Sequence, residues 1–349
     1  MQLRVVQINL HHSASASLDL MKFISDKALD VALIQEPWLV KSKVSGLGLD
    51  GYRLYVPQTE GKVRTCIIAR NYIKLFLLTP YSSGDLTTVV CEHRHRRGLL
   101  LTSAYLPYDE AQPPPQPFRQ LVAYAQTHGL DLVAGCDANG HHQLWGSSDT
   151  NARGESIFDF IISTNLLICN KGNDPTFRNR IRQEVIDITL ATDSITTRVK
   201  DWRVSDVCSF SDHSRILFNV ETSVEVSKPF RNPRKANWEN FSSLARQRLA
   251  ALNVEIGRGN ASIDRAVDRV TRALSDSFRQ SCTLTRPRSK PKPVWWSAEL
   301  GELRAKARKL FNVAKRRRTE EDWDNYRAAF NSYKSNIRTA KTNSWKKFC

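Results

Sequence analysis

The sequence predicts an α/β domain with a mixed β-sheet, followed by a basic α-helical extension. Short runs rich in Val, Ile, Leu and Thr alternate with amphipathic helical patterns through residue 220, which indicates alternating strands and helices. Between residues 65 and 107 several strand patterns follow one another with no helix between them. Because directly consecutive strands tend to pair antiparallel, we expect a mixed sheet rather than a purely parallel one.

Each expected element is recognised by the spacing of its apolar residues. The expected helices lie at 18–29, 117–127 and 155–164, where apolar residues recur three and four positions apart. The Pro-rich stretch at 112–117 is expected to be a loop before the second helix, because proline lacks a backbone donor. The expected strands lie at 3–10, 30–36, 65–69, 74–78, 87–92, 99–107, 131–136, 166–169, 185–191 and 215–220.

After residue 228 the strand patterns stop and only helical patterns follow. Linkers are expected at 228–233 and 286–293, where proline alternates with basic and polar residues. Helical runs near 237–252 and 262–280 lie between these linkers. The C-terminal extension is therefore expected to be helical and to be interrupted by a second linker.

Two amphipathic helices are expected beyond that second linker. Apolar residues recur with alternating three- and four-residue spacing in 300–314 and again in 323–340. The basic run Lys315–Arg318 lies between them, and Thr319 with Asp322 three residues later is suited to cap the second helix. The simplest arrangement is an antiparallel helical hairpin with a basic tip. That tip would be a solvated turn, an RNA contact or a nuclear import signal.

The net charge of +17 is concentrated in the C-terminal part. Residues 1–225 carry 23 Lys and Arg against 24 Asp and Glu, whereas residues 226–349 carry 29 against 11. The first part is therefore near neutral and the second has a surplus of +18. This asymmetry predicts a globular body followed by an arm that is attracted to a polyanion, with nucleic acid as the first candidate and an anionic membrane surface as the second.

Compartment signals point to an intracellular protein. The chain has no uncharged apolar run of about 18 residues, the length that a membrane-spanning helix needs, and its N-terminus lacks a secretory leader pattern. Its seven cysteines are an odd number without C-x-x-C spacing, which favours reduced and mostly buried thiols. We therefore expect synthesis in the cytoplasm, no secretion and no membrane partner.

Polar side chains with catalytic potential stand at the ends of separate expected strands. Asn9 and Glu36 close the first two strands, Asp137 closes the run Leu132–Cys136, and Asp212 with His213 precedes the last strand. Acid, amide and imidazole groups at strand ends can converge on one rim of a sheet. Such a rim could hold a divalent cation and a phosphate.

This set of groups suits the hydrolysis of a phosphodiester, which needs charge neutralisation, a base for water and stabilisation of the transition state. Glu36 offers a hard oxygen ligand for Mg²⁺, and Asp137 offers a base that Asn139 can orient. His213 can donate to a phosphoryl oxygen if a carboxylate holds its imidazole charged. Asp187 is the candidate for that carboxylate, because an acid within an apolar strand is expected to have a partner.

Simpler interpretations exist for single members of the set. Asp137 and Asn139 taken alone would more often form an Asx-turn after a strand. The adjacent histidines His11–His12 and His141–His142 lack partners at a familiar zinc-ligand spacing. The segment Ser211–His213 is not accompanied by the G-x-S-x-G turn of serine hydrolases. The catalytic hypothesis therefore depends on the whole set.

Several short motifs occur in an order that resembles a known superfamily. The segments are Gln7–Asn9, Gln35–Trp38, Tyr105–Pro107, Asp137–Asn139, Pro175–Phe177 with Ile186–Asp187, and Ser211–Ser214. In this order they resemble the endonuclease/exonuclease/phosphatase superfamily. The chain looks most like the endonuclease of insect LINE-type (non-LTR) retrotransposons, over roughly residues 1–222. It departs from the family pattern at Ala138 and Ile188, where the family often has aromatic residues.

The resemblance implies a fold, a cofactor and a set of site residues. The implied fold is a four-layer α/β/β/α sandwich of the DNase I type, and the implied cofactor is Mg²⁺, with Mn²⁺ as an alternative. The implied metal ligand is Glu36, with Asn9 and Asp212 close by. The residues implied to act on the phosphate and the water are Asp137, Asn139, His213, Asp187 and Tyr105.

The resemblance also implies a function and a domain plan. Residues 1–222 would form the nuclease, and residues 223–349 would form a basic linker region that leads to a reverse transcriptase absent from this chain. The nuclease would nick one strand of double-stranded DNA in the nucleus and leave a 3′-hydroxyl that primes reverse transcription. Element RNA is a further candidate partner for the basic arm. The alternatives are an abasic-site repair nuclease, a phosphatase, or an inert nucleic-acid-binding module.

Overall fold

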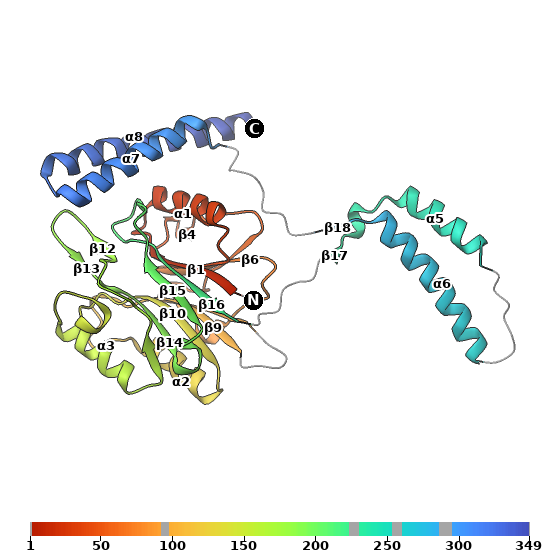
Figure 1. Ribbon diagram of the computed structural model, residues 1–349, viewed down its shortest axis with the longest axis horizontal. Coiled ribbons are helices and arrows are strands. Elements are labelled where there is room, and N and C mark those ends of the chain that lie inside the picture. The colour runs from red at the N-terminus through yellow and green to blue at the C-terminus, as the bar shows by residue number, and fades with distance from the viewer. Residues whose placement is uncertain (1, 92–97, 223–229, 253–259, 286–294, 349) are drawn as a thin grey trace. The chain divides into compact units, whose positions relative to one another are not determined.

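The computed structural model describes residues 2–91, 98–222, 230–252, 260–285 and 295–348 (Figure 1). The chain forms two compact units. The first unit contains residues 1–226 together with 289–349, and the second contains residues 227–288. The linker expected at 286–293 lies outside the described residues. None of the described helices is long and apolar enough to cross a membrane.

The first sheet of unit 1 has the strand order β15-β16-β1-β2-β6-β5. The neighbours β1 and β2 are parallel, and the other neighbouring pairs are antiparallel. Its strands are β1 (Gln2–Asn9), β2 (Val31–Gln35), β5 (Tyr52–Tyr55), β6 (Thr65–Arg70), β15 (Val199–Val204) and β16 (Ile216–Glu221).

The second sheet has the order β11-β14-β10-β9-β8-β7. Here β9 and β10 are parallel, and the other pairs are antiparallel, so the expected mixed pairing is confirmed. Its strands are β7 (Phe76–Leu77), β8 (Leu86–Cys91), β9 (Leu99–Tyr105), β10 (Asp131–Asp137), β11 (Leu166–Ile168) and β14 (Asp187–Thr192). Two short ribbons, β3–β4 (Leu39–Val40, Lys43–Val44) and β12–β13 (Phe177–Arg178, Gln183–Glu184), lie outside both sheets.

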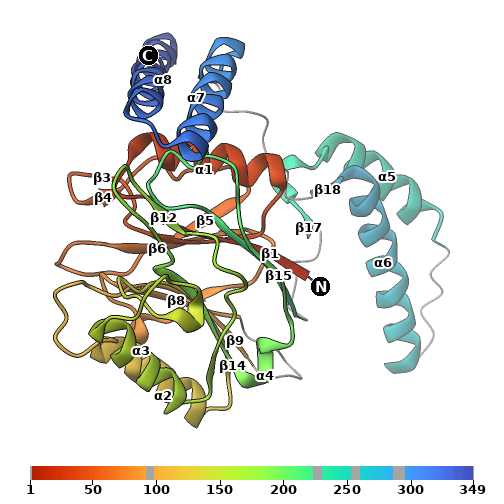
Figure 2. The ribbon, with the colours of Figure 1, turned by 60° about the vertical axis from the view of Figure 1, so that its left-hand side comes forward.

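The two sheets face each other and helices cover their outer faces. Apolar side chains from β1, β2 and β6 mix with those of β8, β9 and β10 in one buried cluster between the sheets. Helices α2 (Gln116–Thr127) and α3 (Ala152–Ile162) cover the second sheet, and α1 (Ala14–Lys27) covers the first. Figure 2 shows these helices on opposite sides of the two sheets. The expected four-layer α/β/β/α sandwich is therefore confirmed.

A polar contact crosses the middle of the sandwich. The amide nitrogen of Gln7 donates to the carbonyl oxygens of Cys136 and Ile188, each at 3.2 Å. The Gln7 side chain can come this close to β10 only because residue 135 is glycine. A Cβ atom at Gly135 would lie 2.8 Å from the Gln7 side chain. Buried amides stay favourable only when they are hydrogen-bonded, so this contact fixes how β1 sits on β10 and β14.

Some elements differ from the expectations, and most of these lie at sheet edges. The strands β5 and β15 were not predicted, because edge strands expose polar and charged side chains and lose the apolar signal. The short helix α4 (Asp193–Thr196) was also missed. Helix α1 begins at Ala14 rather than residue 18, because its first turn is built from Ser and Ala and is capped by Ser13.

The second unit is a helical pair, as expected. Helix α5 (Trp238–Ala250) packs on α6 (Asn260–Ser281). The aromatic rings of Trp238, Phe241 and Phe278 meet at centroid distances of 5.5–6.4 Å. The unit is closed at its base by the antiparallel pair β17 (Phe230–Arg231) and β18 (Leu284–Thr285).

The last two helices form the expected hairpin, but they are not a free arm. Helix α7 (Ala298–Arg317) ends at Arg318, and α8 (Glu320–Phe348) begins after Thr319, whose hydroxyl accepts from the Asp322 N–H at 3.2 Å. Both helices pack over α1, which lies on the first sheet (Figure 1). The expected division of the chain at residue 222 stays a prediction, but the hairpin is structurally part of unit 1.

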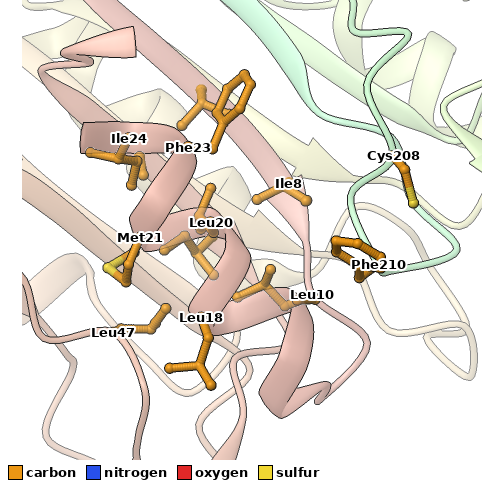
Figure 3. Close-up of a cluster of buried hydrophobic side chains, with 14 of the residues drawn as sticks. Ile8, Leu10, Leu18, Leu20, Met21, Phe23, Ile24, Leu47, Cys208 and Phe210 are labelled. Atoms are coloured by element: carbon orange, nitrogen blue, oxygen red, sulfur yellow. The ribbon is translucent and has the colours of Figure 1, made fainter. Parts of the chain in front are cut away.

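The contact beneath the hairpin is a continuous apolar cluster. Figure 3 shows its α1 side, with Leu18, Leu20 and Met21 on the helix and with Phe210 and Cys208 on the loop before β16. From the hairpin, this cluster includes Leu300, Ala307, Ala314, Tyr326, Tyr333 and Ile337, all buried. The six described cysteines form no disulfide with one another and are all buried, and their burial agrees with the sequence.

Candidate active site

Strand register brings three of the candidate residues into one row. In the second sheet Asp137 pairs with Tyr105 on the parallel strand β9 and with Asp187 on the antiparallel strand β14. In the first sheet Asn9 closes β1 opposite Gln35, the residue before Glu36. Parallel strands end at the same edge and antiparallel neighbours begin there, so these side chains meet at one rim of the sandwich.

Asp137 lies at the centre of this rim. It is 1 % exposed, and its Oδ2 accepts from the Asn9 amide at 2.7 Å. Burial and the nearby charge of Asp187 raise the pKa of Asp137 to about 7, although His213 and Asn9 act in the opposite direction. Its carboxyl group is therefore poised to exchange a proton near neutral pH, as a general base requires.

His213 and Asp187 form a buried pair beside Asp137. The His213 Nδ1 lies 2.8 Å from the Asp187 Oδ2, and the side chains are 5 % and 2 % exposed. Burial by itself would lower the pKa of His213, but the charge and hydrogen bond of Asp187 raise it to about 10. This raised pKa favours the charged form of the imidazole at neutral pH.

The Asp187 pair is supported by Thr176 and Phe177, which belong to a sequence motif that had no assigned role. The Thr176 hydroxyl accepts from the Asp187 N–H at 3.0 Å and fixes the start of β14. The Phe177 ring meets the His213 ring edge-on at a centroid distance of 5.1 Å. The second carboxylate oxygen of Asp187 is buried and has no hydrogen-bond partner among the described residues. This oxygen therefore has a free acceptor site at the rim, which favours a hydrogen-bond donor or a cation there.

A chain of hydrogen bonds joins Asp212 to Asn9. The Ser211 hydroxyl donates to the Asn9 backbone oxygen at 2.9 Å, and it also lies 3.3 Å from the Asp212 carboxylate. The other Asp212 carboxylate oxygen lies 3.3 Å from the His11 Nδ1. Asp212 is half-buried, so one side of its carboxylate remains accessible beside Asn9.

Glu36 follows Gln35, the partner of Asn9, and has a strained backbone conformation. Its φ of +44° is in the left-handed region, where a residue other than glycine costs about 1–2 kcal/mol. Its carboxylate lies 3.5 Å from the His12 Nε2. Strain of this kind often occurs at functional sites, where the surrounding structure holds a side chain in place.

Tyr105 and Asn139 complete the rim. Burial and the charges of Glu36 and Asp137 raise the pKa of Tyr105 to about 12, which keeps its hydroxyl protonated. The Arg64 guanidinium lies over the Tyr105 ring, 4.8 Å from its centroid. The Asn139 amide donates to the Leu106 carbonyl at 3.2 Å. The backbone N–H of Asn139 donates to the Asp137 Oδ1 at 3.3 Å, which is the Asx-turn contact of the simpler interpretation of these two residues.

The structure brings all eight candidate residues to this rim, while their chemical roles stay predictions. Ligand atoms of Asp137, Asp187 and His213 lie within 4.8 Å of one another, a cluster that could hold a metal ion. A charged imidazole has no lone pair to offer, so we consider the carboxylate and amide oxygens of Glu36, Asn9 and Asp212 the better ligand set for a hard cation. His11 and His12, set aside as zinc ligands, instead orient Asp212 and Glu36.

Sequence comparisons find similarity between this chain and retrotransposon proteins. Residues 99–217 match the family model described as endonuclease-reverse transcriptase. The retrovirus-related Pol polyprotein from type-1 retrotransposable element R1 of Bradysia coprophila is 23 % identical over 241 residues, which cover 62 % of this chain and 24 % of that relative. The chain thus spans about a quarter of the length of the curated relative it matches.

Solved structures share the fold. The endonuclease domain of TRAS1, a telomere-specific non-LTR retrotransposon, matches with a TM-score of 0.55 at 24 % identity and covers 63 % of this chain and 99 % of its own. The AP endonuclease LMAP from Leishmania major matches with a TM-score of 0.51 at 12 % identity, over 63 % of this chain and 88 % of its own. At these identities the likeness establishes the fold.

Proposed function

We propose that this domain of the endonuclease/exonuclease/phosphatase superfamily is a divalent-metal-dependent endonuclease that nicks one strand of double-stranded DNA. The observation that supports it best is the buried cluster of Asp137, Asp187 and His213, in which a carboxyl group with a pKa of about 7 lies beside an imidazole whose pKa is raised to about 10. A base and a cationic donor side by side suit the attack of water on a phosphodiester.

Each side chain has a distinct task in this mechanism. The deprotonated Asp137 accepts a proton from the attacking water, and the Asn9 amide orients the carboxylate through its 2.7 Å hydrogen bond. The charged His213 donates to a phosphoryl oxygen, while Asp187 fixes its ring and maintains its charge. The Tyr105 hydroxyl, protonated at neutral pH, donates to the same phosphate.

The oxygen-rich rim fits a Mg²⁺ ion, with Mn²⁺ as an alternative. Glu36 would hold it, with Asn9 and Asp212 close by, because Mg²⁺ takes one or two carboxylates and keeps several waters. When bound, the cation neutralises charge on the scissile phosphate and stabilises the leaving oxygen. The unpartnered carboxylate oxygen of Asp187 and the pKa of Asp137, which burial and the charges of Asp187 and Glu36 raise, are consistent with an acidic rim that can accept a cation.

The test is relaxation of supercoiled plasmid to open circles. Chelation should abolish nicking, and Mg²⁺ should restore it. Asp137→Asn and His213→Ala should each slow nicking by about 10²-fold or more, the usual scale for losing acid–base or charge stabilisation. The controls are Asp193→Asn, on the surface of α4, and His128→Ala, at the exposed end of α2. Rates like the wild type in the two rim variants would remove those residues from the mechanism.

Substrate arms of the same assay separate the alternatives. Cleavage only at abasic lesions would assign the domain to repair, and hydrolysis of a small phosphate ester without nicking would make it a phosphatase. A stably folded chain that binds DNA but never cuts it would be an inert binding module. If the domain has the proposed function, the nick would leave a 3′-hydroxyl that a reverse transcriptase could extend. The nick would be made in the nucleus. Element RNA is a proposed partner of the basic C-terminal part.

A further inference from the structure

A groove of about 840 Å³ runs from the candidate active site to the C-terminal hairpin. It begins at His11 and Asp212 on the catalytic rim and is closed on the far side by α7 and α8. The volume lies within the range of roughly 300–1,000 Å³ that is usual for ligand sites. The groove therefore has room for a nucleotide-sized ligand beside the scissile phosphate.

Aromatic rings form one wall of the groove. The Phe330 ring stacks on Phe210 at a centroid distance of 5.1 Å and on Tyr326 at 5.7 Å, with interplanar angles of 11° and 7°. Trp323, half-buried, extends this wall along α8, and Trp38 faces it from the body. Flat rings that are partly accessible offer stacking platforms for other flat rings.

Positive charge lines the same groove. Lys334, Arg338 and Lys341 project from α8 into its lining, and Asp212 is the one acidic side chain that lines it among the described residues. The Lys334 ammonium lies 4.8 Å from the Phe330 ring centroid, so charge and aromatic surface are adjacent. Positive charge next to aromatic rings is complementary to an anionic ligand that carries aromatic groups.

Arg178 is the strongest indication of an anion. Its residue is 8 % exposed, its Nε is buried without a hydrogen-bond partner, and its side chain forms no hydrogen bond or close ion pair within the described part of the chain, although the charge of Asp174 acts on it from farther away. Its backbone N–H donates to the Asp212 carbonyl at 2.7 Å, which anchors it at the catalytic rim. An unpaired buried cation is costly, so its position at the groove indicates that an anion completes the site.

We propose that this groove binds an unpaired segment of the DNA strand next to the scissile phosphate. Bases stack on the wall formed by Phe330 and Trp323, and a backbone phosphate pairs with Arg178. Bases in a duplex already stack on each other, so aromatic platforms beside cations favour unpaired nucleotides. The choice of DNA rests on the proposed nuclease function, whereas the groove itself is argued from its own side chains.

The test is anisotropy of a labelled single-stranded oligodeoxynucleotide with the full chain in chelator, so that no cleavage occurs. Trp323→Ala should weaken binding by roughly 5- to 100-fold, the scale for loss of one stacked base. Arg178→Gln and Lys334→Gln should each lower the slope of log K against log salt by about 0.7, the value for one single-strand phosphate. Matched controls are Trp345→Ala, on α8 away from the groove, and Arg203→Gln, on an exposed edge strand.

The outcomes are distinguishable from those of the nicking assay. Equal affinity of wild type, Trp323→Ala and Lys334→Gln for the single strand would refute the groove, even if the buried Arg178→Gln variant fails to fold. Tighter binding of RNA than of DNA of the same sequence would overturn the choice of ligand. Groove-dependent DNA binding by a chain that never nicks plasmid would contradict the proposed function and support this inference.

Discussion

A buried ionic cluster joins the hairpin to the body, and its removal should destabilise unit 1. Asp19 on α1 is fully buried and accepts from Arg215, which is also fully buried, and from Arg304 and Arg308 on α7. We predict that Asp19→Asn, which keeps the size of the side chain but removes its charge, leaves three arginines without their shared carboxylate. The amide NH₂ would also face an arginine donor.

The magnitude follows from the burial of the pair. Removing one partner of a buried ion pair lowers the free energy of unfolding by about 3–5 kcal/mol. This is a large share of the roughly 5–15 kcal/mol that a typical domain has. Arg304 and Arg308 retain some solvent contact, with exposed fractions of 10 % and 24 %, so most of this cost arises at Arg215. With a urea dependence of about 3 kcal/mol per M, the unfolding midpoint should fall by about 1–1.7 M.

The assay is urea unfolding followed by tryptophan fluorescence. The control is Asp26→Asn on the same helix, where an i,i+4 pair with Lys22 is partly exposed and contributes only about 0.3–0.5 kcal/mol. The refuting result would be an Asp19→Asn midpoint indistinguishable from that of Asp26→Asn. In that case the three arginines do not depend on Asp19, and the hairpin is held by apolar contacts alone.

Two further predictions concern acidity and chain truncation. Nicking should rise as pH passes about 7, because Asp137 must lose its proton, and should fall as pH passes about 10, because His213 loses its own; a rate independent of pH from 6 to 10 would contradict these roles. The stability that His213 gains from its raised pKa is fully present below pH 6.5 and is lost as pH rises through about 10. Truncation at residue 288 should expose the apolar face of α1 and lower both the melting temperature and the nicking rate. Replacing 232–283 by a short Gly-Ser turn should spare both, since Arg231 and Leu284 are already paired neighbours; equal damage by the two deletions would refute the packing argument.

Local patterns were sufficient to predict the central elements and the rim. Apolar runs specify the central strands because a strand buried on both faces needs apolar side chains along its length. Asp137 and Glu36 could be assigned to the rim because each directly follows such a run. Asp187 could be paired in advance because an acid inside an apolar strand requires a partner. The edge strands β5 and β15 could not be predicted, because they are only partly buried and their polar side chains resemble those of a loop.

The sequence by itself determined the charge division of the chain, its amphipathic C-terminal helices and the polar residues at the strand ends. Each of these features depends only on residues that are close together in the sequence. Tertiary structure alone decided what those helices cover. The apolar stripe of α7 and α8 requires burial, but its pattern does not show which surface will cover it. Arg304 contacts Asp19 only because the fold brings together residues that are 285 positions apart in the sequence. The burial of Arg178 beside Asp212 was decided in the same way, since burial is a property of packing and not of neighbours in sequence.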